Sequence, residues 1–378
     1  MSKEPTRVEL DPPSSTQPKS ELAAPPEQPE VRRADDGEVQ DRLIELIELV
    51  AGTADRYDAK LVRELMTAAL KLIPDGRGTG ELKLMTAAMK ELRYAYRVFA
   101  QYPDARKVTI FGSARTPEDH PDYKSAVVFS KLMAQMGWMS ITGAGDGIMK
   151  AGHEGPGREA SFGVAIHLPF ETTANEYITG DEKLINFRYF FTRKLMFLSQ
   201  ADAIVCFPGG FGTLDETFET LTLVQTGKAS MVPIVFIDGD RDGDNGSYWE
   251  GWERYIRQQL LTRGWISEED LNLFYIAKDA QDAGDHVTKF YKNYHSSRYV
   301  HDDLVIRINK RLAEEDIDRL NEEFAVLVKK GRIVQRDAYS QEQDHLDLPR
   351  IAFTHTRYKY GLIRALIDRI NSFDAPDV

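Results

Sequence analysis

The stretch AIVCFPGGFGTLDETFE, Ala203 to Glu219, joins an apolar run to a helical segment through a glycine-rich turn. An apolar run without a polar face predicts a strand that is covered on both sides, as in a parallel sheet. Glycine tolerates positive φ and lets another group approach the bare backbone. The turn after this strand is therefore expected to expose a row of amide N–H groups at the edge of a sheet.

The same alternation of short β-rich runs and helical stretches begins at Lys107. This alternation is typical of a parallel sheet with crossover helices. The sequence therefore predicts an α/β fold, a Rossmann-like parallel sheet with helices on both faces. Its strands are expected at 107–111, 138–142, 162–168, 203–207 and 232–237.

Composition divides the rest of the chain. Seven of the 17 prolines lie between Pro5 and Pro29, among serine, glutamate and glutamine, so residues 1–36 are predicted to be a disordered tail. Helical periodicity over 37–104 predicts a helical lead-in. The Rossmann-like domain would then occupy 105–295, and 296–378 would form a small α/β appendage. We expect its strands at 303–308, 331–336 and 349–355, and its helices at 314–328 and 359–370.

The composition favours small-molecule chemistry. The 378-residue chain has a formal net charge of −12, which argues against a surface that binds nucleic acid or anionic lipid. Its apolar runs fall well short of the roughly 20 residues that span a bilayer, and no signal-peptide core is visible, so a cytoplasmic protein is expected. The single cysteine, Cys206, lies in a predicted strand and excludes an intramolecular disulfide. The histidines show no local metal-binding spacing, so no metal is predicted.

Three predicted strands end in glycine-rich turns, at 112–115, 143–149 and 208–216. In an open α/β sheet, ligands bind outside the carboxyl ends of the strands. The middle turn has the pattern G-x-G-x-G, which differs from the dinucleotide fingerprint G-x-G-x-x-G. In the last turn Gly212 is followed by Thr213 and Leu214, and not by the lysine of a P-loop. These departures disfavour NAD and ATP.

The last turn still offers a strand, a row of amides and a helix that begins near Gly212. This geometry can bind phosphate through the helix dipole and unpaired N–H groups. Thr213 can add its hydroxyl or merely cap the helix. A tight strand-to-helix turn without a ligand is the alternative for any one of these loops. Three loops at one sheet edge favour a ligand site.

Acidic residues follow the last turn directly. Asp215, Glu216 and Glu219 complement the helix dipole, but an anion seat gains nothing from carboxylates beside it. The spacing of three puts Glu216 and Glu219 on one face, and either could stabilise an oxocarbenium-like sugar whose phosphate lies on the amides. Upstream, the segment 187–197 contains Arg188, Arg193 and Lys194. An arginine there could hold a phosphate or a carboxylate, or simply face solvent.

The segment PGGFGTLDE, Pro208 to Glu216, resembles the P-G-G-x-G-T-x-x-E motif of the LOG family. These phosphoribohydrolases include cytokinin-activating enzymes and bacterial nucleotide 5′-monophosphate nucleosidases, and many carry the historical label lysine decarboxylase. Four further segments occur in the order of the family across 107–237. They are IFGSAR, TGAGDGIMKAG, FFTRKLMF and TFETLTLVQTGK. No segment of the chain resembles a pyridoxal-phosphate lysine site.

The resemblance implies hydrolysis of the N-glycosidic bond of a nucleoside 5′-monophosphate to free base and ribose 5-phosphate, without a cofactor. It implies that Arg193 and Glu216 are the catalytic residues. For Glu219 and Asp146 a structural role is favoured over that of a catalytic helper. It also implies a homodimer or larger homo-oligomer, with the site near the subunit interface. The 5′-phosphate would lie on Gly209, Gly210, Gly212 and Thr213, and the other substrate contacts would come from Gly112, Ser113, Arg115, Gly143, Gly145, Gly147 and Lys194.

Two departures from the family concern the substrate. Compact members have three glycines where this chain has Gly143, Ala144 and Gly145, and they lack the helical lead-in and the appendage. The longer architecture is more similar to the bacterial nucleotidase branch. The main alternative is a non-catalytic carrier of molybdenum cofactor or another nucleotide-like ligand, and a regulatory nucleotide sensor is a third. The presence of both Arg193 and Glu216 favours the enzyme.

Overall fold

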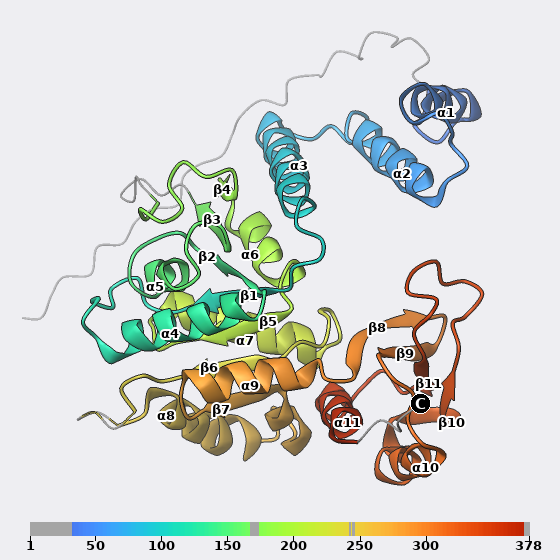
Figure 1. The fold of residues 1–378 in the computed structure, drawn as a ribbon. Coiled ribbons are helices and arrows are strands. Elements are labelled where there is room, and N and C mark those ends of the chain that lie inside the picture. Colours follow the sequence, from blue (N-terminus) through green and yellow to red (C-terminus); the bar gives the residue numbers. More distant parts are fainter. Residues whose placement is uncertain (1–31, 167–173, 242, 244–245, 374–378) are drawn as a thin grey trace, which may run out of the picture. The chain divides into compact units, whose positions relative to one another are not determined.

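The computed structural model describes residues 32–166, 174–241, 243 and 246–373 (Figure 1). Residues 1–31 of the predicted disordered tail lie outside this part, as do residues 167–168 of the predicted strand 162–168. Two compact units, Met1–Lys83 and Leu84–Val378, divide the chain. None of the described helices is both long and apolar enough to cross a membrane.

The first unit contains two helices, α1 (Gly37–Ala51) and α2 (Tyr57–Lys71), and the first turn of α3 (Thr79–Phe99). These match the three predicted helical segments. Helix α1 ends at Gly52, whose left-handed backbone, with φ of 77°, terminates the helix. The side chain of Gln40 donates a 3.0 Å hydrogen bond to Thr67 Oγ1 and so joins α1 to α2.

The second unit is built on a seven-stranded sheet in the order β4-β3-β2-β1-β5-β6-β7, in which every pairing is parallel. The predicted Rossmann-like fold is confirmed. The chain winds outward from β1 to β4, returns to place β5 beside β1, and then winds the other way. The switch point between β1 and β5 is where open α/β sheets bind ligands. The strands are β1 Lys107–Phe111, β2 Met139–Thr142, β3 Ser161–Ile166, β4 Leu184–Phe187, β5 Ala203–Cys206, β6 Ile234–Ile237 and β7 Phe274–Ala277.

Helices cover both faces of this sheet and create two separate cores (Figure 1). Along β5, Ile204 and Cys206 face one core, while Ala203 and Val205 face the other. The core of Cys206 is completed by α3, α6 (Phe190–Ser199), α7 (Phe211–Gln225) and α8 (Tyr248–Tyr255). The other is completed by α4 (Pro121–Gln135), α5 (Ile148–Glu154) and α9 (Ala280–Phe290). Short helical turns follow at η1 Ile256–Leu261 and η2 Glu268–Leu273.

The two edge strands of the parallel sheet, β4 and β7, were not predicted. Each has four residues, which is too short for an alternation to be recognised. Their residues are also less completely buried than those of the central strands, because an edge strand has a neighbour on one side only.

A second sheet, antiparallel and in the order β10-β11-β9-β8, follows near the C-terminus. The three predicted strands and two predicted helices are present, although the first helix ends at Glu323 and a short η3 (Ala325–Leu327) follows it. Strand β8 was not predicted, because the polar sequence YHSSRYV lacks an apolar alternation. The elements are β8 Tyr294–Val300, β9 Asp303–Ile308, α10 Glu314–Glu323, β10 Val328–Arg336, β11 Arg350–His355 and α11 Tyr360–Ser372.

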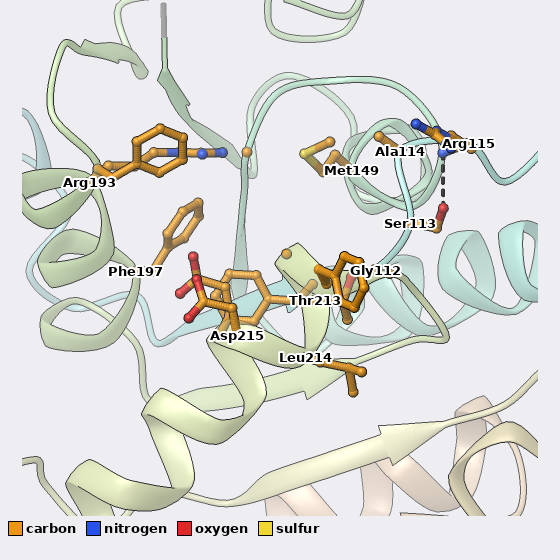
Figure 2. A pocket seen from close by; sticks show the side chains of 17 residues that line it. Gly112, Ser113, Ala114, Arg115, Met149, Arg193, Phe197, Thr213, Leu214 and Asp215 are labelled. Carbon is orange, nitrogen blue, oxygen red and sulfur yellow. Dashed lines mark hydrogen bonds between the residues drawn. The ribbon is translucent and has the colours of Figure 1, made fainter. Parts of the chain in front are cut away.

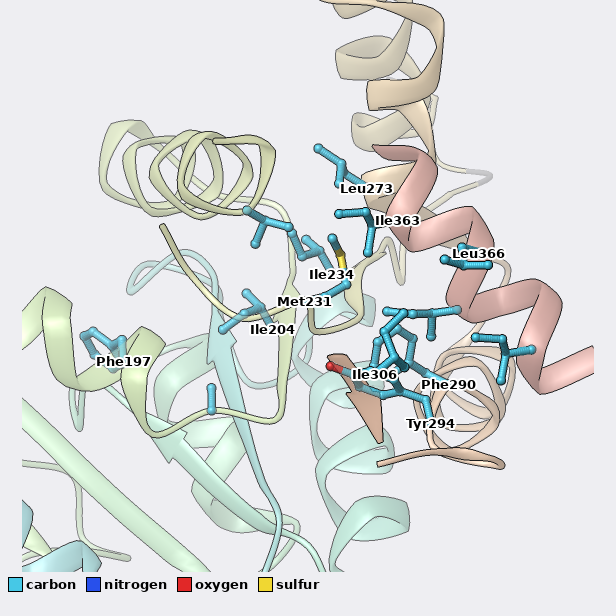
Figure 3. Packing of buried hydrophobic residues seen from close by; sticks show 14 of the residues in the cluster. Phe197, Ile204, Met231, Ile234, Leu273, Phe290, Tyr294, Ile306, Ile363 and Leu366 are labelled. Atoms are coloured by element: carbon cyan, nitrogen blue, oxygen red, sulfur yellow. The ribbon is translucent and has the colours of Figure 1, made fainter. Parts of the chain in front are cut away.

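The antiparallel sheet shares one core with the parallel sheet (Figure 3). Ile306 of β9 and Ile363 of α11 belong to the same buried cluster as Ile204 and Ile234 of the parallel strands. Both sheets belong to the compact unit Leu84–Val378. The predicted division of this unit at residue 295 stays a prediction.

Helix α11 lies so close to η2 that Gly361 has no room for a side chain. A Cβ at this position would overlap the backbone carbonyl of Glu269. We expect Gly361→Ala to lower the free energy of unfolding by roughly 2 kcal/mol, because overpacking against backbone forces the helix to move. Chemical denaturation followed by circular dichroism measures this change.

Gly284 in α9 is the matched control. Its Cβ would meet no atom closer than Met136 Cε at 3.6 Å. Gly284→Ala is therefore expected to stabilise the protein by up to about 1 kcal/mol through helix propensity. Equal stabilities for the two variants would contradict the close packing at Gly361.

Candidate active site

The loops that follow β1, β2 and β5 surround one cavity of about 730 Å³ at the switch point (Figure 2). Helices α6 and α7 complete its wall. The position agrees with the sheet edge predicted from the three glycine-rich turns. The lining residues are Phe111, Gly112, Ser113, Ala114, Arg115, Gly143, Met149, Phe190, Arg193, Phe197, Gly210, Phe211, Gly212, Thr213, Leu214, Asp215 and Glu216.

Backbone hydrogen bonds tie the loops together. The amide of Ser113 donates to the Pro208 carbonyl at 3.1 Å, which joins the loop after β1 to the loop after β5. The Ser113 carbonyl accepts from the amide of Ile148 at 3.0 Å, which joins the first loop to the start of α5. The Ser113 hydroxyl accepts from the amide of Arg115 at 3.1 Å and closes the first loop on itself (Figure 2).

Two glycines make this close approach possible. Gly147 has a φ of 58°, and a Cβ there would overlap the Ser113 carbonyl. A Cβ on Gly209 would overlap the Thr213 side chain and lie 2.9 Å from the amide nitrogen of Ser113. Both positions need glycine because another segment lies against their backbone.

The backbone of Gly210 and Gly212, in contrast, faces open space. Apart from adjacent residues and the backbone of α7 itself, no atom of the described residues lies within 4 Å of the position that a Cβ would take on either glycine. Both line the cavity with Thr213, at the first turn of α7. Gly209 does not line the cavity, and its carbonyl accepts a 2.7 Å hydrogen bond from the Tyr248 hydroxyl of α8. The predicted phosphate seat therefore presents Gly210, Gly212 and Thr213 to the cavity, with Gly209 behind them.

The loop after β2 brings only Gly143 to the cavity wall. A Cβ there would lie 2.5 Å from Arg193 Nη2 and 2.5 Å from Met149 Sδ, so glycine leaves room for both side chains. Gly145 and Gly147 support the loop from outside the lining. Ala144, where compact LOG members have glycine, adopts a φ of 65° and is buried.

A buried histidine and an asparagine hold this loop. Asn175 Nδ2 donates to the carbonyls of Ala144 and Gly145, at 3.1 and 3.0 Å, and lies 3.1 Å from His153 Nδ1. Because His153 Nε2 donates to the Phe162 carbonyl at 3.0 Å, Nδ1 is the ring nitrogen that accepts. Burial lowers the pKa of His153 to about 4, so the ring is neutral at pH 7. Sequence reasoning missed both residues, whose role depends on tertiary contacts.

Arg193 of α6 is oriented by backbone and by an aromatic ring. Its Nε donates to the Val164 carbonyl of β3 at 2.8 Å, and its Cζ lies 5.1 Å from the centre of the Phe197 ring. The guanidinium lies beside the backbone of Gly143, and both residues line the cavity. Figure 2 shows the Arg193 side chain at the cavity. The predicted catalytic arginine is thus fixed on the side of the cavity that faces α7.

Glu216 is the least satisfied carboxylate of the site. Its side chain is 13% exposed, and its buried Oε2 has no hydrogen-bond partner within the part of the chain that the structure describes. Burial raises the pKa of Glu216 to about 7, and the negative charges of Glu219 and Asp215 add to this rise. The cations Lys194 and Arg193 oppose it. Such an environment is typical of a carboxylate that exchanges protons near neutral pH.

Lys194 lies against the acidic side chains of α7. Its Nζ is 2.8 Å from Asp215 Oδ2, 2.7 Å from Glu219 Oε2 and 3.6 Å from Glu216 Oε2. Although burial disfavours its charge, these carboxylates raise the pKa of the Lys194 ammonium above its ordinary value. The cavity lining does not include Lys194, which was predicted to contact substrate.

The structure thus brings nine predicted residues together around one cavity. Four others, Gly145, Gly147, Gly209 and Lys194, support the wall from behind, and the suggested helper Asp146 is exposed to solvent. In the described ranges, no three His, Cys, Asp or Glu side chains are grouped to hold a metal ion. The nine are Gly112, Ser113, Arg115, Gly143, Arg193, Gly210, Gly212, Thr213 and Glu216.

The apolar part of the wall was not predicted. Phe190, Phe197 and Phe211 line the cavity with Leu214 and Met149. The segment 187–197 was recognised as aromatic-rich, but its periodicity does not tell which rings face a ligand. Phe211 is 94% exposed, which is unusual for a phenylalanine without a ligand or partner.

Burial of Glu216 predicts a pH-dependent cost to stability. Its pKa is raised in the folded protein, so the folded state loses stability as pH rises from the unfolded value near 4.5 through 7. Glu216→Gln removes this cost, which is on the order of 3 kcal/mol. We expect the variant to be more stable than the wild type at pH 8 and nearly equal at pH 4.5. Urea denaturation at both pH values measures the difference, and a constant difference would contradict the raised pKa.

Comparison with known proteins supports the predicted family for part of the chain. Residues 143–287 match the family model described as "Possible lysine decarboxylase". No curated protein matches the sequence.

Several solved structures are similar to the chain. The molybdenum cofactor binding protein from the phototrophic bacterium Rippkaea orientalis is 16% identical, with a TM-score of 0.35 over 49% of this chain and 97% of that chain. The molybdenum cofactor carrier protein from Chlamydomonas reinhardtii is 19% identical, with a TM-score of 0.34. The match covers 49% of this chain and 97% of that chain. DNA processing protein A from Helicobacter pylori is 12% identical, with a TM-score of 0.33. The match covers 51% of this chain and 83% of that chain.

The family match covers the loop after β2, the catalytic candidates on α6 and α7, and the strands through β7. It includes the Pro208 to Glu216 motif on which the LOG resemblance rests. The match over residues 143–287 to the family described as "Possible lysine decarboxylase" is consistent with the LOG family predicted from the motifs.

Proposed function

We propose that the protein hydrolyses the N-glycosidic bond of nucleoside 5′-monophosphates and releases free base and ribose 5-phosphate. The observation that carries this proposal is the Glu216 carboxylate, buried and without a hydrogen-bond partner for Oε2 among the described residues, on the same wall as an open row of amides. An anion seat beside an unsatisfied carboxylate fits a substrate that is anionic at one end and develops positive charge at the other.

The amides of the loop after β5 suit the 5′-phosphate. Gly210, Gly212 and Thr213 surround the N-terminus of α7, a 15-residue helix whose dipole favours an anion. Ser113 and Arg115 add further donors from the loop after β1. Glu216 follows Gly212 by four residues, about 6 Å along the helix axis, so a sugar bound through its phosphate extends toward the carboxylate.

In the proposed reaction, the oxygen of a water molecule attacks C1′, and the bonding electrons of C1′–N leave with the base. The Glu216 carboxylate takes a proton from the water, and its charge stabilises the oxocarbenium-like sugar. The base gains one proton, so that one water is consumed for each bond broken. Arg193 positions the ribose 5-phosphate opposite Glu216, because its guanidinium is held by the Val164 carbonyl and the Phe197 ring.

A non-catalytic carrier of molybdenum cofactor or another nucleotide-like ligand is the alternative. A carrier of an anionic ligand gains no affinity from a buried carboxylate with a raised pKa, and it bears the stability cost of that burial. A site of this kind is more typical of catalysis than of transport. The arrangement of Glu216 therefore favours the enzyme.

We also expect a homodimer or larger homo-oligomer. Phe190, Phe191 and Phe211 are 54%, 52% and 94% exposed at or beside the cavity wall, and large exposed apolar side chains mark interaction surfaces. A cytoplasmic location and the absence of a cofactor stay predictions from the sequence.

A panel of substrates tests the proposal directly. We expect purified protein to release free base and ribose 5-phosphate from at least one of AMP, GMP, CMP, UMP and isopentenyladenosine monophosphate. Glu216→Ala should lower kcat by about a thousandfold or more, because the carboxylate acts in the transition state. Nucleotide affinity, measured by calorimetry, should stay within about tenfold.

Glu154→Gln is the matched control for this experiment. Glu154 is a partly buried glutamate of α5 that accepts a 2.6 Å hydrogen bond from Tyr123 and does not line the cavity. Its variant should retain turnover. If no nucleotide is hydrolysed but one is retained tightly, the carrier replaces the enzyme as the function of this site.

The pH dependence of turnover provides a further prediction. Because Glu216 acts as a carboxylate and its pKa is about 7, kcat should fall about tenfold per pH unit below pH 6 and level off above pH 8. Initial rates of ribose 5-phosphate release between pH 5 and 9 measure the profile. A rate that is constant from pH 5 to 8 would exclude Glu216 as the base.

A further inference from the structure

Lys194 forms an ionic bridge between the two helices that supply the catalytic candidates. It lies on α6, next to Arg193, and its side chain reaches the acidic face of α7. Asp215 and Glu219 hold its ammonium at 2.8 and 2.7 Å, within hydrogen-bond distance. The Glu216 oxygen Oε2 is 3.6 Å away, close enough for an ion pair but too far for a hydrogen bond.

The Lys194 end of the bridge is largely buried, whereas Asp215 is exposed. The Lys194 side chain is 18% exposed, compared with 33% for Glu219 and 62% for Asp215. Ion pairs of such limited exposure are screened less by salt than surface pairs are. The charge of Lys194 therefore acts on Glu216 at short range through a partly desolvated region.

Among the other groups that face Glu216, Arg193 is also a cation, but it lowers the pKa of Glu216 less than Lys194 does. From its own helix come Asp215 and Glu219, whose negative charges disfavour a further carboxylate. From α6 comes Arg193, which donates to the Val164 carbonyl. From β5 comes Cys206, a buried thiol that is neutral because burial raises its pKa to about 12.

We propose that Lys194 is a positioning residue for Glu216: anchored by Asp215 and Glu219, its ammonium favours the ionised form of the Glu216 carboxylate and holds it at the cavity wall. Asp215 and Glu219 then act through Lys194. This assignment explains why three acids occupy two turns of one helix beside an anion seat. It rests on the proposed role of Glu216, but its test does not require turnover.

The test is a direct titration of Glu216 in the full chain. Protein labelled with ¹³C at the glutamate side-chain carboxyl is followed by NMR between pH 4 and 10, and the spectrum of Glu216→Gln assigns the signal. In the wild type we expect a midpoint near 7. In Lys194→Met the midpoint should rise by at least one pH unit, a tenfold change in the protonation equilibrium. Lys194→Arg keeps the charge and should stay closer to the wild type.

Lys150→Met is the matched control. Lys150 of α5 is 19% exposed and also lies between two carboxylates, Glu118 at 2.7 Å and Glu176 at 3.0 Å, but neither of these carboxylates lines the cavity. Its removal should leave the Glu216 midpoint unchanged. Circular dichroism and thermal unfolding confirm that each variant is folded, and if Lys194→Met does not fold, Lys194→Gln takes its place.

Two results would overturn the proposal. If Lys194→Met loses stability but Glu216 titrates as in the wild type, Lys194 only ties α6 to α7. If the midpoint is unchanged and KM for the nucleotide rises while kcat is constant, Lys194 contacts substrate instead. The two proposals can fail separately. If the protein hydrolyses no nucleotide but Glu216 still titrates near 7 in the wild type and higher in Lys194→Met, the proposed function is refuted and the role of Lys194 stands.

Discussion

The site depends on the approach of three backbone segments at the switch point of the sheet. The amide and the carbonyl of Ser113 bond to Pro208 and Ile148, so the loop after β1 is held between the other two. This is possible only because Gly147 and Gly209 present no side chain to it. A methyl group at either position would separate the loops and open the cavity. The remaining features of the site are arranged on this backbone contact.

The electrostatics of the cavity combine two requirements that normally conflict. The amides at the start of α7 favour a negative group, and two turns of the same helix carry three carboxylates. The conflict is reduced because the ammonium of Lys194 pairs with Asp215 and Glu219. Only Glu216 is left with a buried oxygen that lacks a hydrogen bond within the described chain. The stability lost by burying this carboxylate is offset by the rest of the core, as is common at sites that do chemistry.

Strand propensity and glycine content made much of the fold and of the cavity predictable. The strands Lys107–Phe111 and Asp303–Ile308 were predicted to the residue, because both are rich in β-branched and apolar residues. The polar strand Tyr294–Val300 was missed, since its pairing with β9 is a tertiary property. The glycine-rich loops were also predicted correctly, because glycine is a local signal of a turn. Tyr248, which holds the Gly209 carbonyl, lies far along the chain from that loop and has no local signal.

The alanine at position 144 shows how a departure from a family pattern can preserve geometry. Its φ of 65° is one that glycine adopts freely and alanine adopts at a cost of about 1 kcal/mol or more. The hydrogen bonds from Asn175 to the Ala144 and Gly145 carbonyls hold the loop in this conformation. The Ala144 methyl lies 3.1 Å from the place that a Gly163 Cβ would take, so it points to β3 and away from the cavity. The bare face of Gly143 therefore stays open to Arg193, and the cavity wall does not need a third glycine.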